Sequence, residues 1–350
     1  MQRLKYKIRV GITMGDPAGI GPEIIPKALK KLKGLANFVI IGDKWVFGQL
    51  SAISYQLSAL KFIDLNNVPH KNFKFGKIKA EYGKASVEYI DKAIELIKNK
   101  QIDCLVTCPI SKEAVSLAGF DNFTGHTEYL SARTNTKYFA MMLLNRKLKF
   151  SLVTGHIPLK DVPSKLDTDK IYKTVLLAYR SLKQLFLIKN PRMAVCGLNP
   201  HASDNGLLGE EENKIIKPAL KRLRLRLRDI DGTLSADVAV LKAAQKKYDC
   251  IIAMYHDQAL IPLKLSDEYA GVNLTLGLPF IRTSPLHGTA FDISGRFNTP
   301  RPEGCGFRPR SIPPLRTPDF SPGGLHLANA TSLIEAIKLA VRCTLNQRKD

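Results

Sequence analysis

Short apolar runs that end in polar side chains recur along this chain, and they constrain its fold more than any other feature. The run Cys250–Tyr255 is too short for a core helix and is apolar on both faces, as strands buried in a parallel sheet are. Helical stretches such as residues 84–98 lie between these runs. Strands that alternate with helices predict an α/β fold with a doubly wound parallel sheet.

A glycine-containing loop, residues 15–21, joins the strand expected at residues 7–14 to a helix that begins near Pro22 and Glu23. A strand, a glycine loop and a helix in this order are able to cradle an anion at the helix N-terminus. The loop matches neither the dinucleotide fingerprint GxGxxG nor the P-loop, so a tight structural turn explains it equally well.

Length and composition place the chain among globular proteins. At 350 residues with 45% hydrophobic content, it is long enough for two domains with ordinary cores. No window approaches the roughly 18 to 20 consecutive apolar residues that span a bilayer, and the N-terminus lacks the apolar region of a signal peptide. We therefore expect a cytoplasmic protein without a membrane partner, and we expect its six scattered cysteines to be reduced thiols.

The charge balance is strongly basic, at +22 from 53 basic and 31 acidic residues, so nucleic acid has to be considered as a partner. The densest basic run, residues 221–228, alternates with period two and predicts a helix end that passes into a strand with one basic face. Basic and aromatic residues are not interleaved as in nucleic-acid modules. A positive cleft that attracts small anions explains the charge with fewer assumptions, and we expect no nucleic-acid partner.

Three histidines occupy equivalent places in the pattern of strands. His156, His201 and His256 each follow the end of an apolar run. Ligand sites in α/β sheets lie beyond the carboxyl ends of strands, and three imidazoles with one open position are what a catalytic divalent metal requires. The sequence therefore favours a three-histidine metal site, although a single histidine after a strand is more often structural.

Two further segments carry polar side chains that suit a ligand site. His126 opens a helix after the polar stretch 121–125, and the apolar run 272–278 carries Asn273. The segment that follows this run is expected to be rich in turns. It contains Arg282, Thr283, Ser284, His287 and Asp292. A loop with only a structural role seldom carries so many.

Several strings of the sequence, in this order, resemble one family: GITMGDPAGIGPE, GHTEYL, GLNPH, YHDQALIPLK and VNLTLGLPFIRTSP followed by HGTAFDI. They are similar to the 4-hydroxythreonine-4-phosphate dehydrogenases of pyridoxal phosphate biosynthesis, over nearly all of residues 7–295 and again over 328–345. The resemblance implies the isocitrate and isopropylmalate dehydrogenase architecture, in which a substrate cleft lies between two α/β/α domains of a homodimer. The expected division is residues 1–120 with 270–350 for one domain and residues 121–269 for the other.

The resemblance also implies a role for each matching position. The metal ligands would be His156, His201 and His256, in a site that the family shares between subunits. The substrate would be held by His126, Thr127, Lys264, Asn273 and Arg282, with Lys264 as the group that transfers a proton. The cofactor, NAD or NADP, would be held by His287, Gly288, Thr289, Ala290 and Asp292.

The reaction that the resemblance implies is the NAD(P)-dependent oxidation of 4-phosphohydroxy-L-threonine. Decarboxylation to 3-amino-2-oxopropyl phosphate would follow, as a step toward pyridoxine 5'-phosphate. The divalent metal would be zinc, magnesium or cobalt, and the sequence does not select among them. Two alternatives stay open: a related dehydrogenase that acts on another four-carbon phosphorylated hydroxy acid, and a binding protein with impaired catalysis.

One segment departs from the family. Residues 296–326 are rich in Pro, Gly and Arg and lack apolar periodicity, whereas the family has a short turn there. We expect either a disordered insertion or the product of a reading-frame change, placed just after the cofactor residues. If the segment replaces a turn that shapes the cofactor pocket, its removal should strengthen NAD binding.

Overall fold

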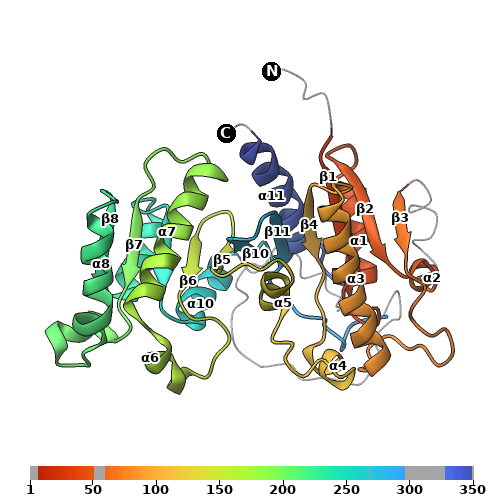
Figure 1. Cartoon of the computed structure of the whole chain (residues 1–350), viewed down its shortest axis with the longest axis horizontal. Coiled ribbons are helices and arrows are strands. Elements are labelled where there is room, and N and C mark those ends of the chain that lie inside the picture. Colours follow the sequence, from red (N-terminus) through yellow and green to blue (C-terminus); the bar gives the residue numbers. More distant parts are fainter. Residues whose placement is uncertain (1–6, 51–59, 268, 296–327, 349–350) are drawn as a thin grey trace, which may run out of the picture.

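A single sheet of eleven described strands runs through the molecule (Figure 1), a computed structural model that describes residues 7–50, 60–267, 269–295 and 328–348. The strands lie in the order β3-β2-β1-β4-β11-β10-β5-β6-β9-β7-β8. Their bounds are β1 Arg9–Thr13, β2 Asn37–Gly42, β3 Lys61–Asp64, β4 Cys104–Thr107, β5 Ala140–Leu144, β6 Lys149–Leu152, β7 Met193–Cys196, β8 Ile230–Leu234, β9 Cys250–Ala253, β10 Val272–Leu276 and β11 Ile281–Pro285. The α/β class expected from the sequence is confirmed.

The direction of the strands reverses at the centre of the sheet. The strands β3, β2, β1, β4 and β11 are parallel to one another, and β6, β9, β7 and β8 form a second parallel group. Between the two groups, β10 pairs antiparallel with both β11 and β5, and β5 pairs antiparallel with β6. Two strands that are far apart in the sequence, β5 and β10, therefore join the two groups.

Helices pack against this sheet. In Figure 1, α1 and α3 lie beside β1 to β4, and α7 and α8 lie beside β7. The bounds are α1 Gly21–Lys31, α2 Lys44–Gly48, α3 Ala80–Lys98, α4 Lys112–Leu117, α5 His126–Arg133, α6 Val162–Lys165, α7 Thr168–Gln184, α8 Lys217–Arg224, α9 Ala236–Ala244, α10 His256–Ser266 and α11 Thr331–Gln347. Three short helical segments are η2 Leu159–Asp161, η3 Pro200–Gly206 and η4 Glu212–Ile216.

Both faces of the central strands are buried, which explains why the sequence shows apolar runs rather than alternation. Ile251 and Ile252 are neighbours in β9 and both are fully buried, yet they belong to different hydrophobic clusters. Successive side chains of a strand point to opposite faces, so each face of the sheet has its own core. A residue in such a strand has no solvent face on which a polar side chain is favoured.

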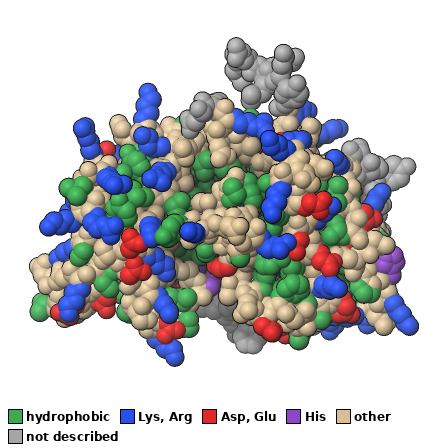
Figure 2. All heavy atoms as spheres, viewed as in Figure 1, with side chains coloured by type: hydrophobic (Ala, Val, Ile, Leu, Met, Phe, Trp, Pro, Cys, Tyr) green, Lys and Arg blue, Asp and Glu red, His purple; other side chains and the backbone are tan. Residues whose placement is uncertain are grey.

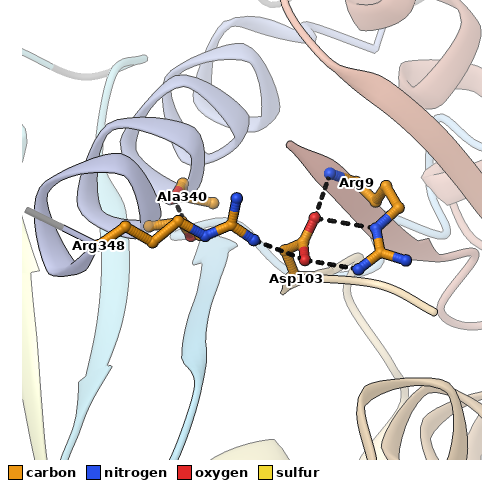
Figure 3. Close-up of polar contacts among 5 residues, drawn as sticks. Arg9, Asp103, Ala340 and Arg348 are labelled. Atoms are coloured by element: carbon orange, nitrogen blue, oxygen red, sulfur yellow. Dashed lines mark hydrogen bonds and ion pairs between the residues drawn. The ribbon is translucent and has the colours of Figure 1, made fainter. Parts of the chain in front are cut away.

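The C-terminal helix α11 returns the end of the chain to the first strands. Asp103, directly before β4, receives hydrogen bonds from the Nη2 atoms of Arg9 in β1 and of Arg348 after α11, both at 2.8 Å (Figure 3). The side chain of Asp103 is only 9% exposed. This one carboxylate therefore ties together β1, β4 and the last turn of α11.

The segment after residue 278, which was expected to be rich in turns, contains a strand. Arg282, Thr283 and Ser284 lie in β11, which pairs with β4 on one side and β10 on the other. All five residues of β11 are buried. The sequence prediction was wrong here because polar residues are rare in a strand that is covered on both faces.

The prediction for the basic run 221–228 is correct only for its first half. Residues 221–224 form the end of α8, but the next strand, β8, begins only at Ile230. The expected basic strand face is therefore absent from residues 221–228. Figure 2 shows Lys and Arg side chains spread over the visible face among acidic ones. The segment 296–326, expected to be either a disordered insertion or the product of a reading-frame change, lies outside the described residues.

The described residues also bear on the expectations about cysteines and membranes. The five described cysteines, at positions 104, 108, 196, 250 and 343, are buried free thiols, as the sequence led us to expect. Among the described residues, no helix combines the length and the apolar character needed to cross a bilayer.

Candidate active site

A cleft of about 310 Å³ brings together residues from both groups of strands. Its walls come from β4, β5, β6, β10 and β11, and from the first residues of α4, α5 and α10. The polar lining consists of Thr107, Lys112, Thr124, His126, Thr127, Glu128, His156, His256, Asn273, Arg282, Ser284 and His287. Basic and imidazole side chains outnumber the one carboxylate in this lining, so the cleft attracts anions.

Arg282 forms the cationic floor of the cleft. Its side chain is 2% exposed and is held by threonine hydroxyls: Nη2 and Thr107 Oγ1 are 2.7 Å apart, and Nη1 and Thr275 Oγ1 are 3.0 Å apart. Burial lowers the pKa of Arg282 to about 10, so the guanidinium is still charged at neutral pH. Hydroxyls orient a guanidinium without neutralising it, and Glu128 acts on it only by charge across the cleft, so Arg282 can still bind an anion directly.

His126 and Thr127 enter the cleft at the N-terminus of α5. Thr127 Oγ1 lies 3.4 Å from Arg282 Nη1, and the Nε2 atom of His126 is buried without a hydrogen-bond partner. Burial, together with the charges of Arg282 and Lys112, lowers the pKa of His126 well below its ordinary value. The imidazole is thus neutral at pH 7, and its buried nitrogen is free to bind a ligand atom.

His156 and His256 form a pair at the rim of the cleft, with ring centroids 5.0 Å apart. His156 follows β6, and His256 is the first residue of α10. The Nδ1 atom of His256 lies 2.7 Å from Asp257 Oδ1, which leaves its Nε2 lone pair available. Burial lowers the pKa of His156, and Lys112 and His256 add to the effect, so its ring is also neutral, as a metal ligand must be.

The third predicted metal ligand, His201, does not join this pair. The strands β6, β9 and β7 are neighbours and parallel, so the three histidines do follow three adjacent strand ends. His201, however, lies exposed in a left-handed turn of residues 201–205, whose φ angles run from +45° to +70°. Among the described residues, no group of three side chains is placed to hold a metal ion.

The loop that carries His201 is held by one buried carboxylate. Glu212 Oε1 accepts hydrogen bonds from the backbone N–H groups of Leu198 and Asn199, both at 2.8 Å. These hydrogen bonds lower the pKa of Glu212 against the opposing effect of burial. A left-handed turn of five residues without glycine is unfavourable by itself, so such anchoring is needed to keep it.

The other predicted site residues divide into two sets. Asn273 lines the cleft from β10, and its Oδ1 atom is buried without a hydrogen-bond partner. His287 and Gly288 also line the cleft. Lys264 lies exposed on α10 outside the lining, and the predicted cofactor residues Thr289, Ala290 and Asp292 lie beyond it as well.

Sequence reasoning missed two charged residues of the lining. Lys112 begins α4, five residues after the end of β4, so the rule that strand ends carry ligand residues would have found it. Glu128 lies in the first turn of α5, where an acidic residue is common for helix stability alone. Nothing in the sequence separates these two roles of Glu128.

The glycine loop 15–21 is a tight structural turn and not an anion cradle. Gly15 has a φ of +75°, and a Cβ atom there would lie 2.3 Å from Pro109 O. The N–H groups that a phosphate would need are already used within the protein: Asp16 N donates to Pro109 O, and Ala18 N donates to Asp16 Oδ1, each at 2.9 Å. Burial raises the pKa of Asp16 to about 7.

Comparisons with known proteins agree over most of the chain. A family model described as pyridoxal phosphate biosynthetic protein PdxA matches residues 28–301. A 4-hydroxythreonine-4-phosphate dehydrogenase from Sulfurihydrogenibium sp. (strain YO3AOP1) is 45% identical over 301 residues, which cover 83% of this chain and 92% of the relative. A D-threonate 4-phosphate dehydrogenase from Cupriavidus necator is 42% identical over 307 residues, covering 82% of this chain and 91% of the relative.

A solved structure is similar over nearly the whole chain. The 4-hydroxythreonine-4-phosphate dehydrogenase from Klebsiella pneumoniae superposes with a TM-score of 0.77 and 33% sequence identity, covering 98% of this chain and 99% of that one. The similarity therefore extends to the arrangement of the strands and helices around the cleft.

Proposed function

The chain belongs to the PdxA family of pyridoxal phosphate biosynthetic proteins, and from this premise we propose that it oxidises 4-phosphohydroxy-L-threonine with NAD or NADP. The resemblance seen in the sequence motifs is confirmed at the level of the family. The observation that carries the proposal is Arg282, a buried guanidinium that hydroxyls hold and no carboxylate contacts among the described residues. The phosphate of such a substrate supplies the missing charge.

The proposed reaction has two steps, an oxidation at C3 and a decarboxylation. Oxidation moves a hydride from C3 to the nicotinamide, which supplies the redox chemistry, and moves the hydroxyl proton to a base. The resulting 3-oxo acid loses its carboxylate as carbon dioxide, and a proton takes its place at C2. We assign the proton transfer to Lys264, and the binding of the substrate to His126, Thr127, Asn273 and Arg282.

The residues at the rim of the cleft fit a divalent metal in part. His156 and His256 lie close together, and Asp257 orients the ring of His256, as is typical of imidazole ligands. A bound zinc, magnesium or cobalt ion would act as a Lewis acid at the hydroxyl and at the carbonyl that it becomes. We assign the third imidazole to His201 from a second copy of the chain, because His201 lies away from its own cleft.

A homodimer gives a role to Lys264 and His201, which both lie outside the cleft of their own chain. Lys264 lies on α10 between Ile261 and Leu265, whose side chains are 59% and 83% exposed. Large apolar side chains around a functional residue are typical of a surface that another molecule covers. We propose that a second copy covers α10, so that Lys264 and His201 complete the neighbouring cleft. The division into residues 1–120 with 270–350 and residues 121–269, and the cytoplasmic location, also stay proposals.

A second candidate substrate is D-threonate 4-phosphate, since a relative named for it is nearly as similar as the one above. The two substrates differ at C2, where one carries an ammonium group and the other a hydroxyl. Glu128 favours the ammonium, because its carboxylate lines the cleft and accepts no side-chain hydrogen bond among the described residues, although its charge also acts on Arg282. A carboxylate that is free to accept hydrogen bonds can bind an ammonium group of the ligand.

The deciding experiment measures NADH or NADPH formation with each phosphorylated substrate. The proposal expects a clearly higher kcat/KM for 4-phosphohydroxy-L-threonine. A preference for D-threonate 4-phosphate would transfer the assignment to the second candidate. Binding of the substrate without any turnover would instead identify a binding protein with impaired catalysis.

A further inference from the structure

One helix, α1, holds the chain on both sides of residues 296–327. Glu23 Oε1 accepts a hydrogen bond from Gly295 N at 2.7 Å, and Lys27 Nζ donates one to Ala328 O at 3.2 Å. Side chains four positions apart lie on the same face of a helix, with Cβ atoms about 5–6 Å apart. The described chain therefore leaves and rejoins the same face of α1 within one helical turn.

The chain between β11 and Gly295 is also held directly before α1. Ile20 N donates to Thr289 O at 3.0 Å, and Ser294 Oγ donates to Ala18 O at 2.6 Å. Residues 287–295, which we call the cofactor loop, thus have three anchors on residues 18–23. None of these three anchors involves a residue beyond Gly295.

The hydrogen bond between Gly295 and Glu23 is buried, and the backbone conformation of Gly295 is closely constrained. Glu23 is 2% exposed, and Gly295 has a φ of +77°, a region that favours glycine. A Cβ atom at position 295 would lie 2.6 Å from Phe75 Cβ, so the backbone approaches its neighbours as closely as it can. Burial raises the pKa of Glu23, whereas the Gly295 N–H and Lys27 oppose that shift. Loss of this hydrogen bond would leave a buried donor and a buried acceptor without partners, which lowers the stability of the fold.

We propose that Glu23 and Lys27 form a clasp on α1, and that Glu23 is a positioning residue for the nicotinamide cofactor. The inference rests on the proposed function and on the cofactor residues that the family resemblance implies, all of which lie in the cofactor loop. With the clasp closed, the shape of the cofactor loop is set by α1 and does not depend on the chain beyond Gly295. Removal of residues 297–326 therefore leaves NAD affinity unchanged, in contrast to the expectation from the sequence alone.

A double-mutant cycle read by calorimetric titration of NAD tests the clasp. The variants are Glu23→Ala, a deletion of residues 297–326 closed by a short glycine-containing turn, and the two combined. The deletion alone should change the Kd by less than about twofold, and Glu23→Ala should raise it about tenfold. In the Glu23→Ala background, the deletion should change the Kd again by about threefold or more, because Gly295 has then lost its anchor on α1 and the end of the loop becomes sensitive to the chain that follows it.

Three controls separate positioning from folding. Glu23→Gln keeps an oxygen acceptor for Gly295 N and should restore NAD affinity, whereas Lys30→Ala on the exposed part of α1 should have no effect. Lys27→Met should lower the unfolding temperature and leave the NAD Kd unchanged. Equal effects of the deletion in both backgrounds would overturn the clasp. So would a Glu23→Ala variant that weakens substrate and NAD binding equally.

Hydrogen exchange distinguishes a wrong clasp from a wrong function. Backbone amides of residues 287–295 should exchange faster in Glu23→Ala than in the wild type, and at the wild-type rate in Lys30→Ala. Unchanged exchange in Glu23→Ala rejects the clasp whatever the enzyme does. Faster exchange in a protein that neither binds NAD nor turns over substrate keeps the clasp as a structural feature and rejects the proposed function. This measurement also decides the matter if the deletion variant does not fold.

Discussion

His156 and His256 face each other with ring centroids 5.0 Å apart, although they follow different strands and are far apart in the sequence. The contact exists because β6 and β9 are parallel neighbours, so their carboxyl ends lie side by side. Asp257 fixes the orientation of one ring through a 2.7 Å contact. The pair is therefore the part of the proposed metal site that one chain builds alone.

Mixing two inactive variants tests whether the site is shared between subunits. We expect His156→Ala and His201→Ala each to lose divalent metal and activity, because each removes a ligand. If a dimer shares its sites, random exchange of subunits should restore about a quarter of the wild-type activity, since half of the dimers then carry one intact site. A mixture that stays inactive after subunit exchange would show that all three ligands act within one chain.

Arg282→Lys tests the assignment of the phosphate. The lysine keeps the charge but loses the fork that Thr107 and Thr275 orient, so the KM for the phosphorylated substrate should rise about 10- to 100-fold. NAD affinity should stay within about twofold of the wild type, because the cofactor loop has separate anchors. Arg146→Lys, on the surface beside Glu335, is the matched control. A parallel loss of NAD binding would point to a folding defect.

Glu128→Gln tests the choice between an amino acid and a hydroxy acid as substrate. The exchange keeps the shape of the side chain and removes the charge that would bind an ammonium group. The kcat/KM for 4-phosphohydroxy-L-threonine should fall about tenfold or more, while turnover of D-threonate 4-phosphate stays the same or rises. Glu113→Gln, on the exposed part of α4, serves as the control. An equal fall for both substrates contradicts the assignment.

Asp103→Asn tests the junction of β1, β4 and α11. Burial acts against the charged form, but the hydrogen bonds from Arg9 and the charge of Arg348 leave the pKa of Asp103 below its ordinary value of 3.8. The carboxylate therefore stabilises the fold fully above that value, and the contribution is lost as the pH falls below it. We expect Asp103→Asn to lower the free energy of unfolding by about 1–3 kcal/mol at pH 7.

The difference between wild type and Asp103→Asn should shrink on acidification. Denaturant unfolding at pH 7 and near pH 3 measures it, with the exposed Asp121→Asn as control. A difference that is the same at both pH values would mean that the charge of Asp103 has no part in the effect.

The strands and the pairing of His156 with His256 could be predicted from the sequence, whereas the burial of Arg282 could not. Apolar runs reveal strands because both faces of this sheet are covered, and histidines after such runs lie at strand ends. The partners of Arg282, by contrast, depend on the register that places Thr275 opposite it and on the neighbouring strand β4. The sequence does not encode strand neighbours in any local pattern, so a buried arginine held by hydroxyls cannot be deduced from it.

The position of His201 could not be predicted from the sequence, for a different reason. Its strand was predicted correctly, but the left-handed turn after that strand contains no glycine to signal it. That turn is kept by Glu212, which lies on a later segment and looks like an ordinary acidic helix start. A local rule for strand ends cannot anticipate a turn that a distant side chain stabilises.

The central position of β10 and β11 has a consequence for the chain while it is being made. Until residues 272–285 have left the ribosome, β4 and β5 each lack one neighbour, and an unpaired strand edge is a template for association with other chains. At ordinary rates of translation, the interval between the synthesis of β5 and of β11 is on the order of ten seconds. The nascent protein is therefore most prone to aggregate during that interval, and it is then that a chaperone would be of most use.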